Sequence, residues 1–211
     1  MTENNDNIEF LIDDIDTANK IKDRLPRLFQ IAEQESSRAG KMGMEVGVLR
    51  ERIIIALLIH VFGDDNVETN IPSTEKETDV EVFDYPISIK TITGTGGIKA
   101  IWTVDAAKAL EFCNNYQPKA DSILVQIRWD NYGKFYFIPL SVQSNTFKTM
   151  GPNNYFKLPK KGTNPRGVEF SKDAIQNLFN HPETKSIDIL WKRSSIKYNA
   201  YERWTEYWKE K

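Results

Sequence analysis

The sequence has a single cysteine, Cys113, and no apolar run long enough to cross a membrane. A lone cysteine excludes an intrachain disulfide and a multi-cysteine metal site, and it favours a reducing environment, so we expect a cytoplasmic protein with no membrane association. The N-terminal stretch is acidic and polar, unlike a secretory signal peptide. The 211 residues, 40% hydrophobic and 27% charged, are typical of one globular domain with appendages.

The chain also lacks the strong positive charge that is typical of many nucleic-acid-binding domains. Its formal net charge is −2, but the distribution is uneven: from Lys134 onward 14 Lys and Arg face 7 Asp and Glu, a net of +7, which leaves −9 for residues 1–133. The basic C-terminal half could face a polyanion, or the asymmetry could be a solvated surface.

A β-hairpin predicted over residues 79–90 organises the chain. Alternating valine and isoleucine runs flank a short connection at residues 83–86. With the turn centred between residues 84 and 85, Asp79 lies opposite Lys90 on an exposed face, while the valines and isoleucines share the buried face. Such a carboxylate and ammonium are either a surface ion pair of little energetic value or part of a site.

A second carboxylate, Glu51, lies within the apolar stripe of a helix predicted from about residue 45 to residue 62. The members of this predicted stripe are Met44, Val48, Ile55, Leu58 and Phe62. Because burying an unpaired carboxylate is costly, we expect a cationic group to meet Glu51. A helix acid followed by a strand acid and a strand lysine is the set of groups that a metal-dependent phosphodiesterase requires.

The rest of the chain predicts an α/β fold, in which a mixed β-sheet is flanked by helices. We expect an acidic leader at residues 1–16, a catalytic core at about residues 40–140 and a basic C-terminal part at residues 141–211, all in a single domain. Further predicted elements are a helix at 18–37 with a break or kink near Leu25 to allow Pro26, a strand at 67–71, a helix at 104–114, a hairpin of strands 121–129 and 134–140, a basic loop at 144–168, a helix from Ser171 to Asn180, a strand at 186–192 and a helix at 198–211.

The order of helix acid, strand acid and strand lysine resembles the PD-(D/E)XK nuclease superfamily and, within it, the type II restriction endonucleases of the ThaI group. The resemblance covers about residues 40–100 and rests on the spacing of Met44, Glu51, Asp79 and Lys90. It implies a restriction-endonuclease-like core and a site-specific deoxyribonuclease that belongs to a restriction-modification system.

The match departs from the superfamily pattern at two positions. Thr78 precedes Asp79 where the pattern has proline, and Ser88 stands where many members have the acid two residues before the lysine. The resemblance implies that Glu51 takes over as the second acid. The literal acid-x-lysine sequence in the chain, Glu183-Thr-Lys185, follows no acidic strand and is predicted to be incidental.

The resemblance also implies a mechanism. Glu51, Asp79 and Lys90 are the predicted catalytic residues, with Glu51 and Asp79 as oxygen ligands of one Mg²⁺. Ca²⁺ or Na⁺ could occupy the same site without supporting cleavage. Lys90 would stabilise the developing charge and help to orient or deprotonate the attacking water. The products would carry a 5′-phosphate and a 3′-hydroxyl.

Met44 is the residue predicted to contribute to DNA recognition. It lies between Gly43 and the helix that carries Glu51, where an apolar side chain could be presented next to the scissile phosphate. Similarity to the ThaI group implies insertion into the CG steps of CGCG from the minor groove, with blunt cleavage at CG/CG. The alternative is that Met44 packs in a loop or core.

Other predicted contacts involve the DNA backbone and a second protomer. Four basic residues are candidates for phosphate contacts: Lys99, Lys160, Lys161 and Arg166. Because a palindrome is cut on both strands, we expect a homodimer on double-stranded DNA. Two alternatives stay open: a repair or junction-resolving nuclease on the same core, and a non-catalytic DNA-binding domain.

Overall fold

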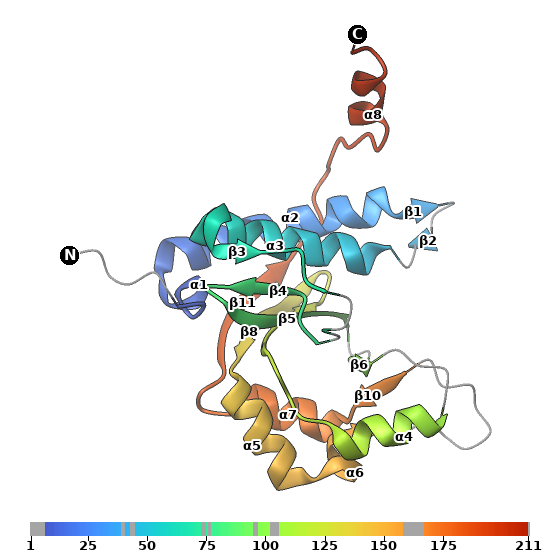
Figure 1. Cartoon of the computed structure of the whole chain (residues 1–211). Helices are drawn as coiled ribbons and strands as arrows, with labels where there is room; N and C mark the ends of the chain where they lie inside the picture. Colours follow the sequence, from blue (N-terminus) through green and yellow to red (C-terminus); the bar gives the residue numbers. More distant parts are fainter. Residues whose placement is uncertain are drawn as a thin grey trace.

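The computed structural model describes residues 7–210 except 39–40, 43–44, 73–74, 76, 95–96, 102–105 and 158–166. At its centre is a mixed six-stranded sheet with the strand order β11-β8-β7-β5-β4-β3 (Figure 1). Its strands are β3 (Val67–Glu68), β4 (Val80–Val82), β5 (Tyr85–Thr93), β7 (Asp121–Ile127), β8 (Asn131–Ile138) and β11 (Lys185–Trp191). Neighbouring strands are antiparallel except β5 and β7, which run parallel.

Helices cover both faces of this sheet (Figure 1). One face is covered by α1 (Phe10–Asp13), α2 (Ile15–Glu35) and α3 (Val46–Phe62). The other is covered by α4 (Ala106–Asn115), α5 (Leu140–Met150), α6 (Pro152–Tyr155) and α7 (Lys172–Asn180). Smaller elements are η1 (Asp64–Asn66), α8 (Glu202–Tyr207), the pair β1 (Ser37–Arg38) and β2 (Lys41–Met42), and a three-stranded sheet of β6 (Lys99–Ile101), β10 (Val168–Phe170) and β9 (Phe156–Lys157).

The side-chain alternation of the central strands divides the interior into two cores. On β7, Ile123 and Val125 pack with the α2 and α3 layer, whereas Leu124 packs with the α4 to α7 layer. A strand that is buried on both faces in this way has a nearly continuous run of apolar residues in its sequence. This is why the sequence at 121–129 predicts a central strand.

Several elements confirm their sequence-based predictions. The α/β class, the helix that ends at Phe62, the hairpin of β7 and β8, and the strand β11 all form. The predicted cap of α7 is present, since the Ser171 hydroxyl accepts a hydrogen bond from the Ala174 backbone N–H at 3.0 Å.

The β4–β5 hairpin forms, but the predicted register is wrong by two residues. The turn is Phe83–Asp84, with φ angles of 52° and 64°, and it pairs Val82 with Tyr85. Two central residues with positive φ make the kind of turn whose twist matches that of the flanking strands. Because the shift is an even number of residues, every side chain keeps the face predicted for it. The face that carries Asp79, Ser88 and Lys90 is not open to solvent as expected. Ser88 is only 6% exposed and lies under the layer of α4 to α7.

The apolar stripe of α3 also differs from the prediction. Its buried residues are Arg50, Ile54, Leu58 and Phe62, whereas Val48 is 50% exposed and Glu51 lies beside the stripe, half-buried. The stripe is therefore rotated relative to the predicted one. The reason is that an arginine with a buried partner occupies a core position that the hydrophobic pattern would not assign to a charged residue.

Four further segments depart from the predictions. Ile8 and Leu11 are buried in the first core, so the described part of the expected leader belongs to the folded body. The helix α2 continues through Pro26 without a break. Within the predicted loop at 144–168, residues 144–150 and 152–155 are helical, and the C-terminal helix is confined to residues 202–207.

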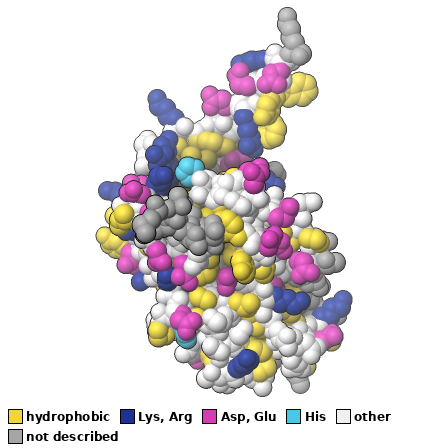
Figure 2. Space-filling view, turned by 60° about the vertical axis from the view of Figure 1, so that its left-hand side comes forward, with side chains coloured by type: hydrophobic (Ala, Val, Ile, Leu, Met, Phe, Trp, Pro, Cys, Tyr) yellow, Lys and Arg dark blue, Asp and Glu magenta, His cyan; other side chains and the backbone are white. Residues whose placement is uncertain are grey.

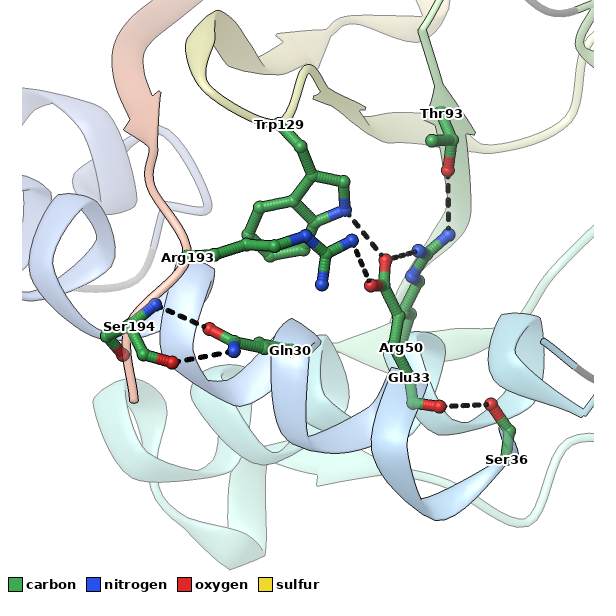
Figure 3. A network of polar contacts seen from close by, with 8 residues as sticks. All are labelled: Gln30, Glu33, Ser36, Arg50, Thr93, Trp129, Arg193 and Ser194. Atoms are coloured by element: carbon green, nitrogen blue, oxygen red, sulfur yellow. Dashed lines mark hydrogen bonds and ion pairs between the residues drawn. The ribbon is translucent and has the colours of Figure 1, made fainter. Parts of the chain in front are cut away.

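A buried carboxylate, Glu33 on α2, joins both the first helical layer and the C-terminal segment to the sheet (Figure 3). It accepts hydrogen bonds from Arg50 at 2.6 Å, from the Trp129 indole N–H at 2.9 Å and from Arg193 at 2.8 Å. Arg50 also donates to the Thr93 hydroxyl on β5 at 3.1 Å. These contacts set the position of α3 relative to β5.

We predict that Glu33→Ala lowers the free energy of unfolding by about 3–5 kcal/mol, because it leaves the buried Arg50 guanidinium without its carboxylate. Urea denaturation of the purified protein measures this change. The matched control is Asp188→Ala, which removes the exposed pair with Lys134 and should cost less than about 1 kcal/mol. Equal losses for the two variants would contradict the prediction.

Candidate active site

The candidate site forms at the N-terminal end of β4, where β5 extends beyond its pairing with β4. The strand β4 begins at Val80 and pairs with β5 only as far as Ile87, although β5 continues to Thr93. Just before β4, the Asp79 backbone N–H still donates to the Ile87 carbonyl at 2.9 Å. The Asp79 side chain then accepts a hydrogen bond from the Ile89 backbone N–H at 2.5 Å. A carboxylate therefore satisfies an edge donor that the short β4 does not reach.

Two more groups from β5 approach the same carboxylate oxygen. The Ser88 hydroxyl donates to Asp79 Oδ2 at 3.3 Å, and Lys90 Nζ lies 3.7 Å from it. The side chains of Lys90 and Asp79 are 29% and 21% exposed, so the pair is partly desolvated rather than a fully solvated surface pair. Ser88, which replaces an acid of the superfamily pattern, thus orients the remaining acid.

An open groove of about 480 Å³ brings the helix acid to the strand acid and the lysine. Its lining residues are Gly47, Glu51, Asp79, Ile89, Lys90, Thr91, Lys99, Ala100 and Ile101. Gly47 and Glu51 lie one helical turn apart on α3, so the missing side chain at Gly47 leaves space in front of Glu51. The three predicted catalytic residues therefore face the same space.

Burial and a neighbouring carboxylate both act on Glu51. Burial raises the pKa of Glu51, and the negative charge of Asp79 raises this pKa further, although Lys90 and Arg52 oppose the shift. Two carboxylates that repel each other across a groove are stabilised when a cation lies between them.

Two carboxylates are a donor set that fits Mg²⁺, and they are too few for a metal ion that is coordinated by protein ligands alone. Among the described residues, no group of three or more His, Cys, Asp and Glu side chains could hold a metal ion. Magnesium is commonly bound by one or two carboxylates and retains several waters or takes phosphate oxygens. Glu51 and Asp79 are the residues that could hold it.

The structure also reveals an acid that the sequence analysis missed, Glu77. It lines a small cavity of about 40 Å³ together with Ser88 and Lys90, behind the open groove. Burial raises the pKa of Glu77, while a hydrogen bond from the Lys119 backbone and the charges of Lys90 and Lys119 act in the opposite direction. Lys90 therefore has carboxylates on two sides. The available sequence signal was an acid two residues before Asp79.

The predicted DNA-contact residues are only partly visible. Lys99 lines the groove, where its ammonium pairs with Glu169 at 3.2 Å. The other five predicted DNA-contact residues lie outside the described residues: Gly43, Met44, Lys160, Lys161 and Arg166.

The literal acid-x-lysine sequence lies elsewhere in the fold. Lys185 is at the start of β11, at the opposite edge of the sheet from β3 and β4, and forms ion pairs with Glu9 and Asp13 at 2.5 Å each. Its position accords with the prediction that Glu183 and Lys185 are incidental to the site.

Comparison with known proteins identifies the family. The family model described as "Restriction endonuclease ThaI" matches residues 11–210. The chain belongs to the ThaI restriction endonuclease family. A solved structure described as "Restriction endonuclease in complex with substrate DNA" is similar to this ThaI-family chain, with 52% sequence identity and a TM-score of 0.89, over 96% of this chain and 98% of that chain. A search of the curated proteins found no match.

Membership of the ThaI family makes this protein a type II restriction endonuclease, a site-specific nuclease. It confirms the resemblance that the spacing of Glu51, Asp79 and Lys90 indicated, and it argues against a non-catalytic domain. None of the described helices is both long and apolar enough to span a bilayer.

The raised pKa of Glu51 predicts a pH-dependent gain of stability in Glu51→Gln. A raised pKa means that the folded protein holds this proton more tightly than the unfolded chain, so ionised Glu51 destabilises the fold near neutral pH. In the presence of a chelator, Glu51→Gln should therefore melt at a higher temperature than the wild type near neutral pH. This gain should shrink as the pH falls through the raised pKa, where the wild type protonates.

Thermal unfolding at several pH values measures the effect. The control variant Glu183→Gln changes an exposed carboxylate outside the groove and should leave the melting temperature nearly unchanged. A melting temperature of Glu51→Gln below that of the wild type near neutral pH would show that the Glu51 charge is compensated without a metal.

Proposed function

We propose that this restriction endonuclease hydrolyses phosphodiester bonds of double-stranded DNA at a short palindrome, using Mg²⁺ held by Glu51 and Asp79 and assisted by Lys90. The observation that carries the proposal is that a helix acid, a strand acid and a strand lysine line one open groove. The arrangement resembles the PD-(D/E)XK pattern, with the second acid supplied by α3. The similar structure described with substrate DNA supports duplex DNA as the substrate.

Asp79 is the best-positioned ligand of the set. Its contacts with Ile89 N–H, Ser88 Oγ and Lys90 Nζ all use Oδ2, so the Asp79 carboxylate that would hold the cation is already oriented. Because its donors come from a sheet strand, the carboxylate is held in place before substrate arrives. Asp79 and Glu51 would hold Mg²⁺, which when bound would supply positive charge for the phosphorane-like transition state and lower the pKa of a bound water.

Lys90 acts on the attacking water and on the developing charge. Its ammonium lies 3.7 Å from Asp79 and beside the cavity that contains Glu77, so it is held at the groove wall rather than free in solvent. As an ammonium it donates hydrogen bonds that orient the attacking water and offset charge on the non-bridging oxygens. Only its neutral amine form could instead accept a proton from that water. The expected products carry a 5′-phosphate and a 3′-hydroxyl.

The proposed DNA contacts extend from the groove to the basic C-terminal part. Lys99 is placed to exchange its pair with Glu169 for a phosphate as the backbone enters the groove. Lys160, Lys161 and Arg166 are proposed to contact phosphates further along the duplex, which matches the net charge of +7 from Lys134 onward.

The proposed target is CG/CG, cut to blunt ends by a homodimer. Gly43 and Met44 immediately precede the helix that carries Glu51, so a Met44 side chain inserted into a CG step would lie close to the scissile phosphate. Two such sites related by a two-fold axis cut both strands of a palindrome.

We predict that Asp79→Asn, Glu51→Gln and Lys90→Met each reduce the rate of plasmid cleavage in Mg²⁺ by at least about a hundredfold, because each removes a group that acts on the reacting phosphate. Cleavage is followed on supercoiled plasmid, and duplex binding is measured in parallel with Ca²⁺. The matched control is Glu183→Gln, in the literal acid-x-lysine sequence, which should cleave at the wild-type rate. Full activity of Asp79→Asn would refute the proposed site.

We predict that Met44→Ala lowers the cleavage rate and the affinity for a CGCG duplex more than it lowers them for an unrelated duplex, because only the CG steps receive the inserted side chain. Rates and affinities on the two duplexes measure this difference, and sequencing of the ends identifies the cut position. Staggered ends, or equal losses on the two duplexes, would contradict the CG/CG assignment.

A further inference from the structure

The C-terminal arm, residues 192–210, leaves the body after β11 and carries α8 away from the sheet and its helices (Figure 1). Four aromatic side chains on it are exposed: Tyr201 by 75%, Trp204 by 52%, Tyr207 by 61% and Trp208 by 90%. Figure 2 shows hydrophobic side chains gathered on this projecting segment beside acidic and basic ones. Large exposed aromatic groups of this kind are typical of a surface that binds another protein.

Contacts with α2 fix the direction of the C-terminal arm. At its base the Arg193 guanidinium lies 4.1 Å from the Trp129 ring centroid and donates to the buried Glu33 (Figure 3). Further out, Glu35 accepts hydrogen bonds from the Tyr198 hydroxyl and from Arg203, at 2.9 Å each. The arm is therefore held out from the end of α2 by specific side-chain contacts.

A second surface, the α2–α3 groove, is lined by residues of α2 and α3. Leu28, Ile53 and Leu57 contribute to its apolar lining, and Leu28 is 40% exposed. The cationic side chains of Lys20 and Arg24 also line it. It therefore combines an apolar floor with positive charge.

We propose that the C-terminal arm of one copy of this chain docks in the α2–α3 groove of a second copy, and that the reciprocal contact forms a two-fold dimer. The charges are complementary in the outer part of the arm, residues 202–210, where Glu202, Glu206 and Glu210 are exposed around the aromatic side chains. The cations at residues 192, 193 and 197 lie nearer its base. The proposal rests on the proposed function, which needs two active sites to cut both strands.

The charges on α8 and just after it favour a protein partner over DNA. From residue 202 to residue 210 three glutamates face two cations, Arg203 and Lys209. Both cations already pair with carboxylates, Arg203 with Glu35 at 2.9 Å and Lys209 with Glu206 at 2.7 Å. A net negative helix of this kind repels phosphate and suits a basic groove.

The test uses the full-length protein and one substitution in each half of the contact. Trp208→Asp alters the C-terminal arm, and Leu28→Asp alters the α2–α3 groove. Each should raise the dimer dissociation constant at least about thirtyfold, as loss of a buried anchor does. Arg24→Glu, at an exposed position, should weaken the dimer through charge alone. The control is Tyr85→Asp, a 65% exposed aromatic position on the β4–β5 turn, which should dimerise like the wild type.

Mixing the two variants gives the decisive measurement. An equimolar mixture of Trp208→Asp and Leu28→Asp can form one intact arm–groove contact, so sedimentation should show a heterodimer tighter than either homodimer. A mixture that stays monomeric, a Trp208→Asp variant that dimerises like the wild type, or a wild-type chain that is monomeric even on duplex DNA would overturn the proposal. So would a Trp208→Asp variant that stays dimeric and loses DNA affinity, which would assign the arm to DNA. Failure of the nuclease proposal is read separately, from plasmid cleavage by Asp79→Asn.

Discussion

The site depends on one hydrogen bond, from the Ile89 backbone N–H to the Asp79 carboxylate. It forms because β4 is too short to pair with the whole edge of β5, so the Asp79 side chain accepts the hydrogen bond that a longer β4 would accept with its backbone. The same bond holds the acid beside Lys90 and leaves the adjacent edge of β5 open as the wall of a groove. An early end to strand pairing thus produces both the ligand position and the access that a polymeric substrate needs.

The helix acid needs separate support, because Glu51 lies on a different layer from Asp79. The neighbouring residue Arg50 is tied to Glu33 on α2 and to Thr93 on β5, which places α3 against the strand that carries Lys90. Glu33 also holds Arg193 at the base of the C-terminal arm. If the arm mediates dimer contacts, then the dimer interface and the helix acid share one buried carboxylate, which offers a physical route for coupling assembly to catalysis.

Sequence reasoning succeeded where local periodicity decides the structure. It identified the helix of Glu51, the hairpin and the central strand predicted at 121–129. The family comparison confirmed the resemblance drawn from the spacing of Met44, Glu51, Asp79 and Lys90. It placed the turn one residue late, because apolar alternation is equally compatible with registers two residues apart. It also missed Arg50 and Glu77, whose burial depends on partners distant in the sequence.

The sequence alone determined which residue types are available and on which face of the β4–β5 hairpin they lie, since a strand has a period of two residues. It thereby identified two acids and a lysine as the chemical set. Only the tertiary structure decided that these three side chains share a groove, that Ser88 orients Asp79 and that an arginine fills the core stripe of α3. The physical reason is that these features depend on where strand pairing stops and on which distant charge meets a buried one, and neither is encoded in local periodicity.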